Sequence, residues 1–505
     1  MKKIIAVHVA GLLIAGAPSF ASPALTIYNE NFAVVRDTVD LNLKPGVNTI
    51  NYTEATMHLE PDSVVLRDPT GRTELQILEQ NFRADPISQG LLLNYYEGKT
   101  IEFEVQDVDN GKTTQKIVRG KIVRSGYVPH QEAYQQYGAQ YEQSQVAYSS
   151  EGGGQPIIEV NGKLMFRLPG EPLFPSLPDD SILKPTLSWQ LDTKQGGAVA
   201  AELSYVTGGM SWHADYNVVA PEKGDTVDLV GWVTMDNQSG KTFRGAKIKL
   251  MAGDVNKIQL NVMRPRYALA LTESLSAGVQ PVSEKAFDEY HLYTLERPAT
   301  LLDRETKQVE FVRATDVKSR VLYVYDGAQI DQNRYNGWNF ENIRNDREYG
   351  TQSNPKVWVM REFSNAESNH LGMPLPKGRI RFYRRDADGQ MEFTGENTID
   401  HTARDEVIRL AMGNAFDIVG ERKRTNFKVD SRGHWMEESF EIKLRNHKKE
   451  SVDVCAVEHL YRSDNWEIEG KSDDFVKTDS QTMEFRVTVP PDGEKTVTYS
   501  VHYSW

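Results

Sequence analysis

The sequence has only one cysteine, Cys455, among 505 residues, so no disulfide can form within the chain. Beyond the N-terminal segment it also has no uncharged apolar run long enough to span a bilayer. Stability must therefore come from buried apolar side chains, and the length suffices for about two to four hydrophobic cores. Cys455 lies in the apolar run 454–457 and is predicted to pack in one of these cores.

Local signatures of several enzyme classes are missing. The chain contains no GxSxG, HExxH or CxxC pattern, which removes the usual evidence for serine hydrolase, zincin or thioredoxin-like chemistry. Three GK[ST] triplets start at residues 98, 240 and 470, but a phosphate-binding loop needs a glycine five positions earlier, where Leu93, Met235 and Asn465 stand. We therefore expect no cofactor, and we favour a protein without enzymatic activity over an enzyme.

The N-terminus has the pattern of a secretory signal. Lys2 and Lys3 precede an apolar stretch of about 15 residues, and the small residue Ala21 marks the expected cut. This stretch is shorter than a membrane span, although an uncleaved anchor is the alternative. Ser22 follows the cut where a lipoprotein would have cysteine. The sequence thus predicts a soluble mature chain, without a transmembrane span, in the periplasm or outside a bacterial cell.

The charge balance limits the partners. Acidic residues outnumber basic ones by 71 to 58, and removing residues 1–21 leaves 56 basic residues and a net charge of about −15. Such a surface repels phosphate backbones, so nucleic acid is excluded as a partner. The expected partner is a glycan or a protein of the cell envelope.

Hydrophobic periodicity predicts the fold class. Short segments alternate apolar and polar residues with period two, which is typical of strands with one buried face. Turn sequences separate them, among them Asp109-Asn110-Gly111, Asn161-Gly162 and Asp388-Gly389. We predict a mainly β, multi-domain antiparallel β-sandwich architecture with little helix. The best helical candidates are residues 283–290 and a short turn near Arg404.

Changes of composition suggest five regions. Residues 130–154 are rich in Tyr, Gln, Ser and Gly and favour an exposed flexible arm, with a helical tyrosine stripe as the alternative. The predicted regions are a signal peptide at 1–21, an N-terminal β domain at 22–127, a Tyr/Gln/Gly-rich and Pro-rich linker with a small hairpin at 128–186, a central β-rich domain at 187–433, and a C-terminal immunoglobulin-like β-sandwich at 434–505.

Two segments are candidates for binding sites. On a strand, His213 and Asp215 share one face while Trp212 lies on the other, and an imidazole beside a carboxylate can bind a metal or move a proton. The alternative is a purely structural role, in which one face of the strand carries polar side chains toward solvent and the other packs aromatic side chains into the core. The polar loop 330–350 carries Tyr335, Trp338 and Phe340 among asparagines, a combination that suits sugars or peptides, although the rings can equally plug the loop.

The chain also resembles a family of exported bacterial proteins. The resemblance rests on LTIYNENFAVVRDTVDL, SWHADYNVV, LVGWVTMDNQSGKTF, KLMAGDVN, FDEYHLYTLERPATL, ETKQVEF, GNAFDIVGERK and the long segment from FSNAESNHLGMPLPKG to ENTIDHT. These resemble domain of unknown function 4139, which is related to the mucoidy-inhibitor-type proteins, without the coiled-coil insertion of that branch. The resemblance implies a secreted β-rich protein and no particular reaction.

Three functional readings follow. The leading one is a non-enzymatic envelope protein that binds a glycan or a protein. The first alternative is a metal-assisted hydrolase centred on His213 and Asp215. The second is an outer-membrane β protein, because residues 497–505 alternate strictly and end on Trp505.

Overall fold

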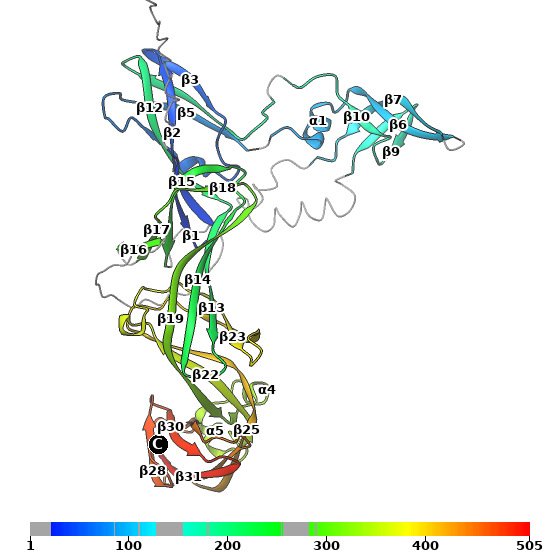
Figure 1. Cartoon of the computed structure of the whole chain (residues 1–505). Helices are drawn as coiled ribbons and strands as arrows, with labels where there is room; N and C mark the ends of the chain where they lie inside the picture. Colours follow the sequence, from blue (N-terminus) through cyan, green and yellow to red (C-terminus); the bar gives the residue numbers. More distant parts are fainter. Residues whose placement is uncertain are drawn as a thin grey trace, which may run out of the picture. The chain divides into compact units, whose positions relative to one another are not determined.

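The computed structural model describes residues 22–84, 86–109, 112–127, 155–178, 181–253, 255, 282–287 and 290–505. Nearly all regular structure in these residues is strand, which confirms the predicted mainly β class (Figure 1). The predicted signal peptide, segment 130–154 and the tip of the turn at Asn110-Gly111 lie outside the described residues. None of the described helices is both long and apolar enough to cross a membrane.

The chain forms two compact units. The first comprises the described residues within 1–212, 235–279 and 283–307, and the second those within 213–234, 280–282 and 308–505. The boundaries predicted at residues 127, 186 and 433 do not coincide with this division. The reason is that strands far apart in the sequence pair with one another, which local composition does not reveal.

The first unit contains an eight-stranded and a three-stranded sheet. The larger sheet has the order β16 (Val282–Phe287), β17 (Tyr290–Leu295), β15 (Phe243–Ala252), β1 (Ala24–Tyr28), β2 (Phe32–Leu43), β12 (Gly197–Gly208) and β4 (Val65–Arg67), with β18 (Ala299–Leu301) paired to β15. The smaller sheet has the order β3 (Gly46–Tyr52), β11 (Thr186–Thr193) and β5 (Gln76–Arg83), and the 3-10 turn η1 (Pro61–Ser63) precedes β4. β1 and β15 pair in parallel.

A small module is inserted into the first unit. Because β5 pairs directly with β11, the intervening chain forms a separate body with its own core. Its sheet has the order β10 (Glu171–Leu173), β6 (Thr100–Asp109), β7 (Lys112–Arg124), β8 (Ile157–Val160) and β9 (Lys163–Met165), beside helix α1 (Gln89–Tyr95). Phe103, Ile122 and Ile158 form the centre of its core. Strands from the predicted N-terminal domain thus pair with strands from the predicted linker.

The second unit is built on a thirteen-stranded sheet. Its order is β24 (Met391–Ile399), β23 (Gly378–Arg385), β13 (Met210–Ala220), β14 (Thr226–Asn237), β19 (Glu305–Asp326), β22 (Lys356–Ser364), β25 (Val407–Asp430), β26 (Trp435–Asn446), β31 (Gly493–Ser504) and β28 (Trp466–Lys471). β27 (Val452–His459) pairs with β19 and β30 (Thr482–Val489), and β29 (Phe475–Lys477) pairs with β30. The remaining elements are β20 (Ala328–Gln329), β21 (Gln352–Ser353), α4 (Gln332–Tyr335), α5 (Phe340–Asn345) and η3 (Glu367–Asn369).

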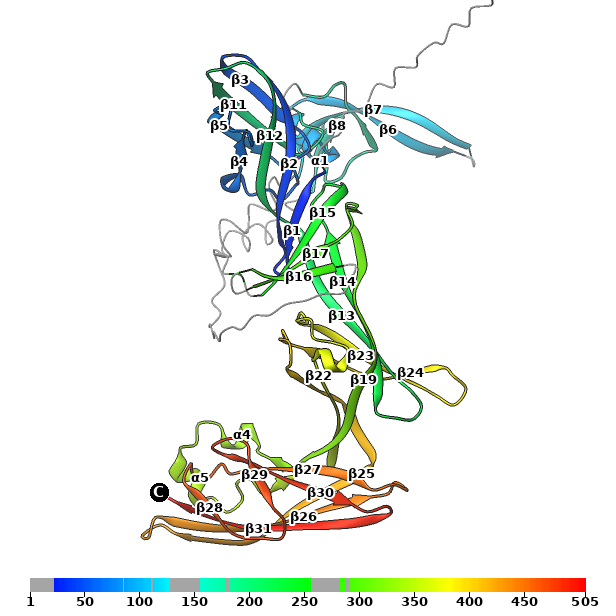
Figure 2. The ribbon, with the colours of Figure 1, turned by 60° about the vertical axis from the view of Figure 1, so that its left-hand side comes forward.

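The C-terminal part of this unit is a two-layer sandwich. Figure 2 shows β26 and β31 running beneath β27 and β30. Residues of β26 alternate between buried and partly exposed along the strand, which places one face in the shared core. That core also includes Tyr325 of β19, Val357 of β22 and Ile418 of β25, so the sandwich does not begin at residue 434 as predicted.

The predicted turns agree with the structure better than the predicted helices do. Asn161 and Gly162 have positive φ angles of 50° and 75° and join β8 to β9 in a tight hairpin, as their sequence predicts. Gly389 turns β23 into β24, and Asp405 forms the short turn next to Arg404. The helix predicted at 283–290 is wrong, because residues 282–287 form β16 at the edge of a sheet, where pairing outweighs weak local helix propensity.

Cys455 is partly buried on β27 and lies beside Glu484 rather than at the centre of a core. Burial, reinforced by the Glu484 carboxylate, raises the pKa of its thiol to about 12. Because only the thiolate reacts, we expect alkylation at pH 8 to be about a thousandfold slower in the native protein than in urea. Timed iodoacetamide labelling followed by mass spectrometry measures both rates, and equal rates would contradict this environment.

Candidate functional site

Strand β13 presents His213 and Asp215 on one face, as its alternation predicts. The His213 Nε2 atom lies 3.1 Å from Asp215 Oδ2. Trp212 lies on the opposite face, only 2% exposed, and its Nε1 donates a hydrogen bond to the carbonyl oxygen of Met251. Trp212 was predicted as a binding residue, but because its side chain is buried it cannot contact a ligand at the surface.

Neighbouring strands fix the Asp215 carboxylate. Thr234 of β14 donates its hydroxyl to Asp215 Oδ2 at 3.0 Å, and Gln308 of β19 donates to the Thr234 hydroxyl oxygen at 3.0 Å. The Asp215 side chain is buried, whereas that of His213 is about half-exposed. A buried carboxylate needs such partners, so Asp215 is a fixed negative centre beneath the surface.

Strand β23 brings two arginines to the same carboxylate. β13 and β23 pair in parallel with Asp215 opposite Arg379. Arg379 Nε and Arg381 Nη1 lie 3.8 and 3.9 Å from Asp215 Oδ1, and Arg381 Nε lies 3.6 Å from an oxygen of Glu396 on β24. These distances exceed hydrogen-bond reach, so the guanidinium donors keep capacity for another acceptor.

An aromatic pair continues this surface along the β23–β24 hairpin. Tyr383 pairs with Phe393, their ring centroids are 5.8 Å apart, and the Phe393 side chain is mostly exposed. Together these side chains form what we call the β23 face. The β23 face comprises His213, Asp215, Arg379, Arg381, Tyr383, Phe393 and Glu396.

The β23 face offers poor metal coordination. Within the described part of the chain, no third histidine, cysteine or carboxylate joins His213 and Asp215 at metal-ligand spacing. Asp215 already accepts a hydrogen bond from Thr234 and faces two guanidinium groups. Cationic neighbours oppose a second cation, so the arrangement suits an anionic group better than a metal ion.

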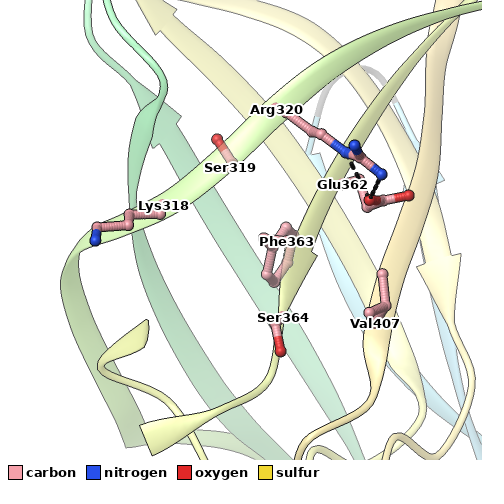
Figure 3. A pocket seen from close by; sticks show the side chains of 7 residues that line it. All are labelled: Lys318, Ser319, Arg320, Glu362, Phe363, Ser364 and Val407. Atoms are coloured by element: carbon pink, nitrogen blue, oxygen red, sulfur yellow. Dashed lines mark hydrogen bonds and ion pairs between the residues drawn. The ribbon is translucent and has the colours of Figure 1, made fainter. Parts of the chain in front are cut away.

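A separate pocket of about 300 Å³ lies along β19 and β22. Figure 3 shows Arg320 and Glu362 meeting on one side of Phe363, with Lys318 directed away from them. Glu362 accepts hydrogen bonds from Arg320 at 2.7 Å and from Arg409 at 2.8 Å. Although burial raises the pKa of Glu362, these two guanidinium groups hold it below its ordinary value, so this carboxylate cannot act as a proton donor near neutral pH.

The predicted aromatic loop is largely closed on itself. Tyr335 is buried, with its ring centroid 5.0 Å from those of both Trp338 and Tyr349 in edge-on geometry. Phe340 is 55% exposed beside Arg344, whose guanidinium also lies 4.7 Å from the Trp505 ring centroid. Tyr335 and Trp338 therefore act as the plug of the loop, and only Phe340 offers an open ring.

Sandwich arginines hold this loop from beneath. Arg462 donates hydrogen bonds to the carbonyl oxygens of Ile343, Asp346 and Tyr349, and to both carboxylate oxygens of Glu438. Arg422 and Arg424 likewise donate to the carbonyl oxygens of Gly350 and Arg347. Sequence reasoning missed these arginines because nothing local distinguishes a buried arginine from a solvated one.

Comparison with known families identifies the region that carries these features. A family model described as a domain of unknown function, DUF4139, matches residues 201–505. The chain belongs to this family. No curated protein matches the chain.

The family match includes the complete β23 face, the pocket and the loop, because all of them lie between residues 213 and 505. It begins within β12, so the small inserted module lies outside the matched residues. The family description names no reaction, and the relation to mucoidy-inhibitor-type proteins stays a prediction. Arg379 and Arg381 were visible in the sequence as alternating charges, but their convergence on Asp215 depends on a parallel pairing across some 160 residues.

Proposed function

We propose that this protein is an exported, non-catalytic binding module whose β23 face holds an acidic glycan of the cell envelope. The observation that carries the proposal is the spare hydrogen-bond capacity of the two arginines beside Asp215. One buried carboxylate faces His213, Arg379 and Arg381, and both guanidinium groups stand too far from it for hydrogen bonds. Arginine donors on a partly exposed surface match carboxylate acceptors well.

The surroundings favour a sugar acid over other anions. Tyr383 and Phe393 extend the β23 face with ring surface, and aromatic faces beside polar groups suit sugar rings. Arg379 and Arg381 are two residues apart on one strand, hence about 6.8 Å apart along it, which suits successive charged groups of a polymer. The strongly acidic remainder of the chain would repel a polyanion elsewhere, so binding should concentrate at this face.

The test is the affinity of the purified mature chain for polygalacturonate, with dextran as the neutral control. Arg379→Ala combined with Arg381→Ala should weaken binding about tenfold or more, because each lost charge-assisted contact contributes roughly 1 kcal/mol. Arg384→Ala removes the same charge from the opposite face of β23, because position 384 is out of alternation with 379 and 381, and it should change affinity less than about twofold. Isothermal titration at low and high salt measures these constants.

Three results would go against the proposal. An unchanged affinity in the double variant places binding elsewhere. If the protein binds polyglutamate but not polygalacturonate, the partner is an acidic protein segment and not a glycan. Release of new reducing ends from polygalacturonate would show that the protein is an enzyme.

A further inference from the structure

The outer face of the C-terminal sandwich carries three metal-ligating side chains from three adjacent strands. Glu437 on β26 pairs with His502 on β31, and Glu469 lies on β28, the next strand. Figure 2 shows these three strands lying side by side. One ligand atom from each residue lies within 4.8 Å of the other two, and within the described residues this is the one such group of three.

The spacing of these atoms fits an ion better than it fits hydrogen bonds. His502 Nδ1 lies 3.9 Å from Glu437 Oε1 and 3.7 Å from Glu469 Oε1. Both distances are too long for hydrogen bonds. A tetrahedral ion with bonds of about 2.0–2.2 Å separates its ligand atoms by about 3.4 Å, so the two His502 distances would need to shorten by only a few tenths of an ångström.

The imidazole nitrogen points to a missing ligand independently of the carboxylates. His502 Nδ1 is shielded from solvent, yet it has no hydrogen-bond partner. Buried polar atoms without partners are rare and call for an explanation. The Trp435 ring stacks on the His502 ring at a centroid distance of 5.7 Å, which fixes the direction of the imidazole.

The backbone supports the same interpretation, and the neighbouring cation, Lys428, is held by the oxygen of Glu437 that does not face His502. A register shift between Ile468 and Gly470 leaves Glu469 as the extra residue of a β-bulge, a device that re-aims side chains. Lys428 Nζ lies 3.1 Å from Glu437 Oε2, which leaves the other oxygen of that carboxylate free to face His502. One imidazole and two carboxylates are ligands that suit Zn²⁺ and similar first-row divalent cations.

We propose that Glu437, Glu469 and His502 form a binding site for a first-row divalent cation, tested here as Zn²⁺. The ion would join the edge strand β28 to β31 and β26, and its open positions would hold water or a ligand from a partner. The site does not depend on the β23 face or on glycan binding. Its structural effect should appear as higher thermal stability of the loaded protein.

The experiment titrates Zn²⁺ into tag-free, full-length mature protein that has been stripped with EDTA, and records affinity and thermal midpoint. We expect one site of micromolar or tighter affinity and a rise in the midpoint. His502→Gln and Glu469→Gln should each weaken binding about tenfold or more. Glu469 is half-exposed, so its variant tests the site without endangering the fold.

Glu467→Gln is the matched control. Glu467 pairs directly with His502 across β28 and β31, but it lies outside the group of three, so its loss should change affinity less than about twofold. The proposal is overturned if the wild-type chain binds no Zn²⁺ at micromolar concentration. It is equally overturned if His502→Gln and Glu469→Gln bind as the wild type does, or if Glu467→Gln weakens binding as much as they do.

Discussion

Replacing Arg462 by alanine is expected to lower the free energy of unfolding by about 3–5 kcal/mol, because it removes the donor to both oxygens of the buried Glu438 carboxylate. The side chains of Arg462 and Glu438 are each only 3% exposed. Arg462 donates to both oxygens of Glu438, at 3.0 and 3.2 Å, and Arg424 would remain as its single charged partner. The carbonyl oxygens of Ile343, Asp346 and Tyr349 would lose their donor as well.

Urea unfolding of the mature chain measures this loss. The matched control is Arg445→Ala, because Arg445 pairs with Glu421 in an exposed ion pair, whose loss should cost less than about 1 kcal/mol. Trypsin should also cut the loop around Arg344 and Arg347 faster in the Arg462 variant, since the loop would no longer be held from beneath. Equal unfolding free energies for the two variants would show that the buried network contributes little.

Replacing Gly378 by alanine is expected to damage both stability and the β23 face. A Cβ atom at Gly378 would lie 2.1 Å from the carbonyl oxygen of Ala214, which is backbone and cannot rotate away. The substitution must therefore push β23 away from β13 at the residue that precedes Arg379. We expect a loss of about 1–3 kcal/mol, together with weakened polygalacturonate binding, because the arginines would move relative to Asp215.

Gly470→Ala separates this effect from the general cost of a side chain at a strand glycine. A Cβ atom there would meet only the Ser500 side chain, at 3.9 Å, so the variant should be as stable as the wild type within about 0.5 kcal/mol. Thermal unfolding and titration with polygalacturonate measure both consequences. Gly378→Ala with wild-type stability and affinity would mean that the close approach of β13 and β23 is not needed.

The sequence was sufficient for features that depend on neighbours along the chain. The period-two alternation of β13 and β26, the hairpin at Asn161-Gly162 and the shared face of His213 and Asp215 all follow from local pattern. Ser88 was a missed local signal, because its hydroxyl caps the start of α1 by accepting from Leu91 N.

Features that depend on distant pairing could not be predicted. Arg379 reaches Asp215 only because β23 lies parallel to β13, and the small module is an insertion only because β5 pairs with β11. The loop at Tyr335 was correctly recognised as aromatic, but its closure depends on Arg462, far along the chain. Pattern reasoning identifies faces of strands, whereas the choice of neighbouring strand decides which faces become a site.

The most direct test of the proposed function is to locate the bound glycan on the protein. Phenylglyoxal labels exposed arginines, and mass spectrometry quantifies the modification at each position with and without polygalacturonate. Binding at the β23 face should protect Arg379 and Arg381 strongly while leaving Arg445, in its exposed pair on the sandwich, labelled as before. Protection of Arg445 with Arg379 and Arg381 still fully reactive would contradict the account.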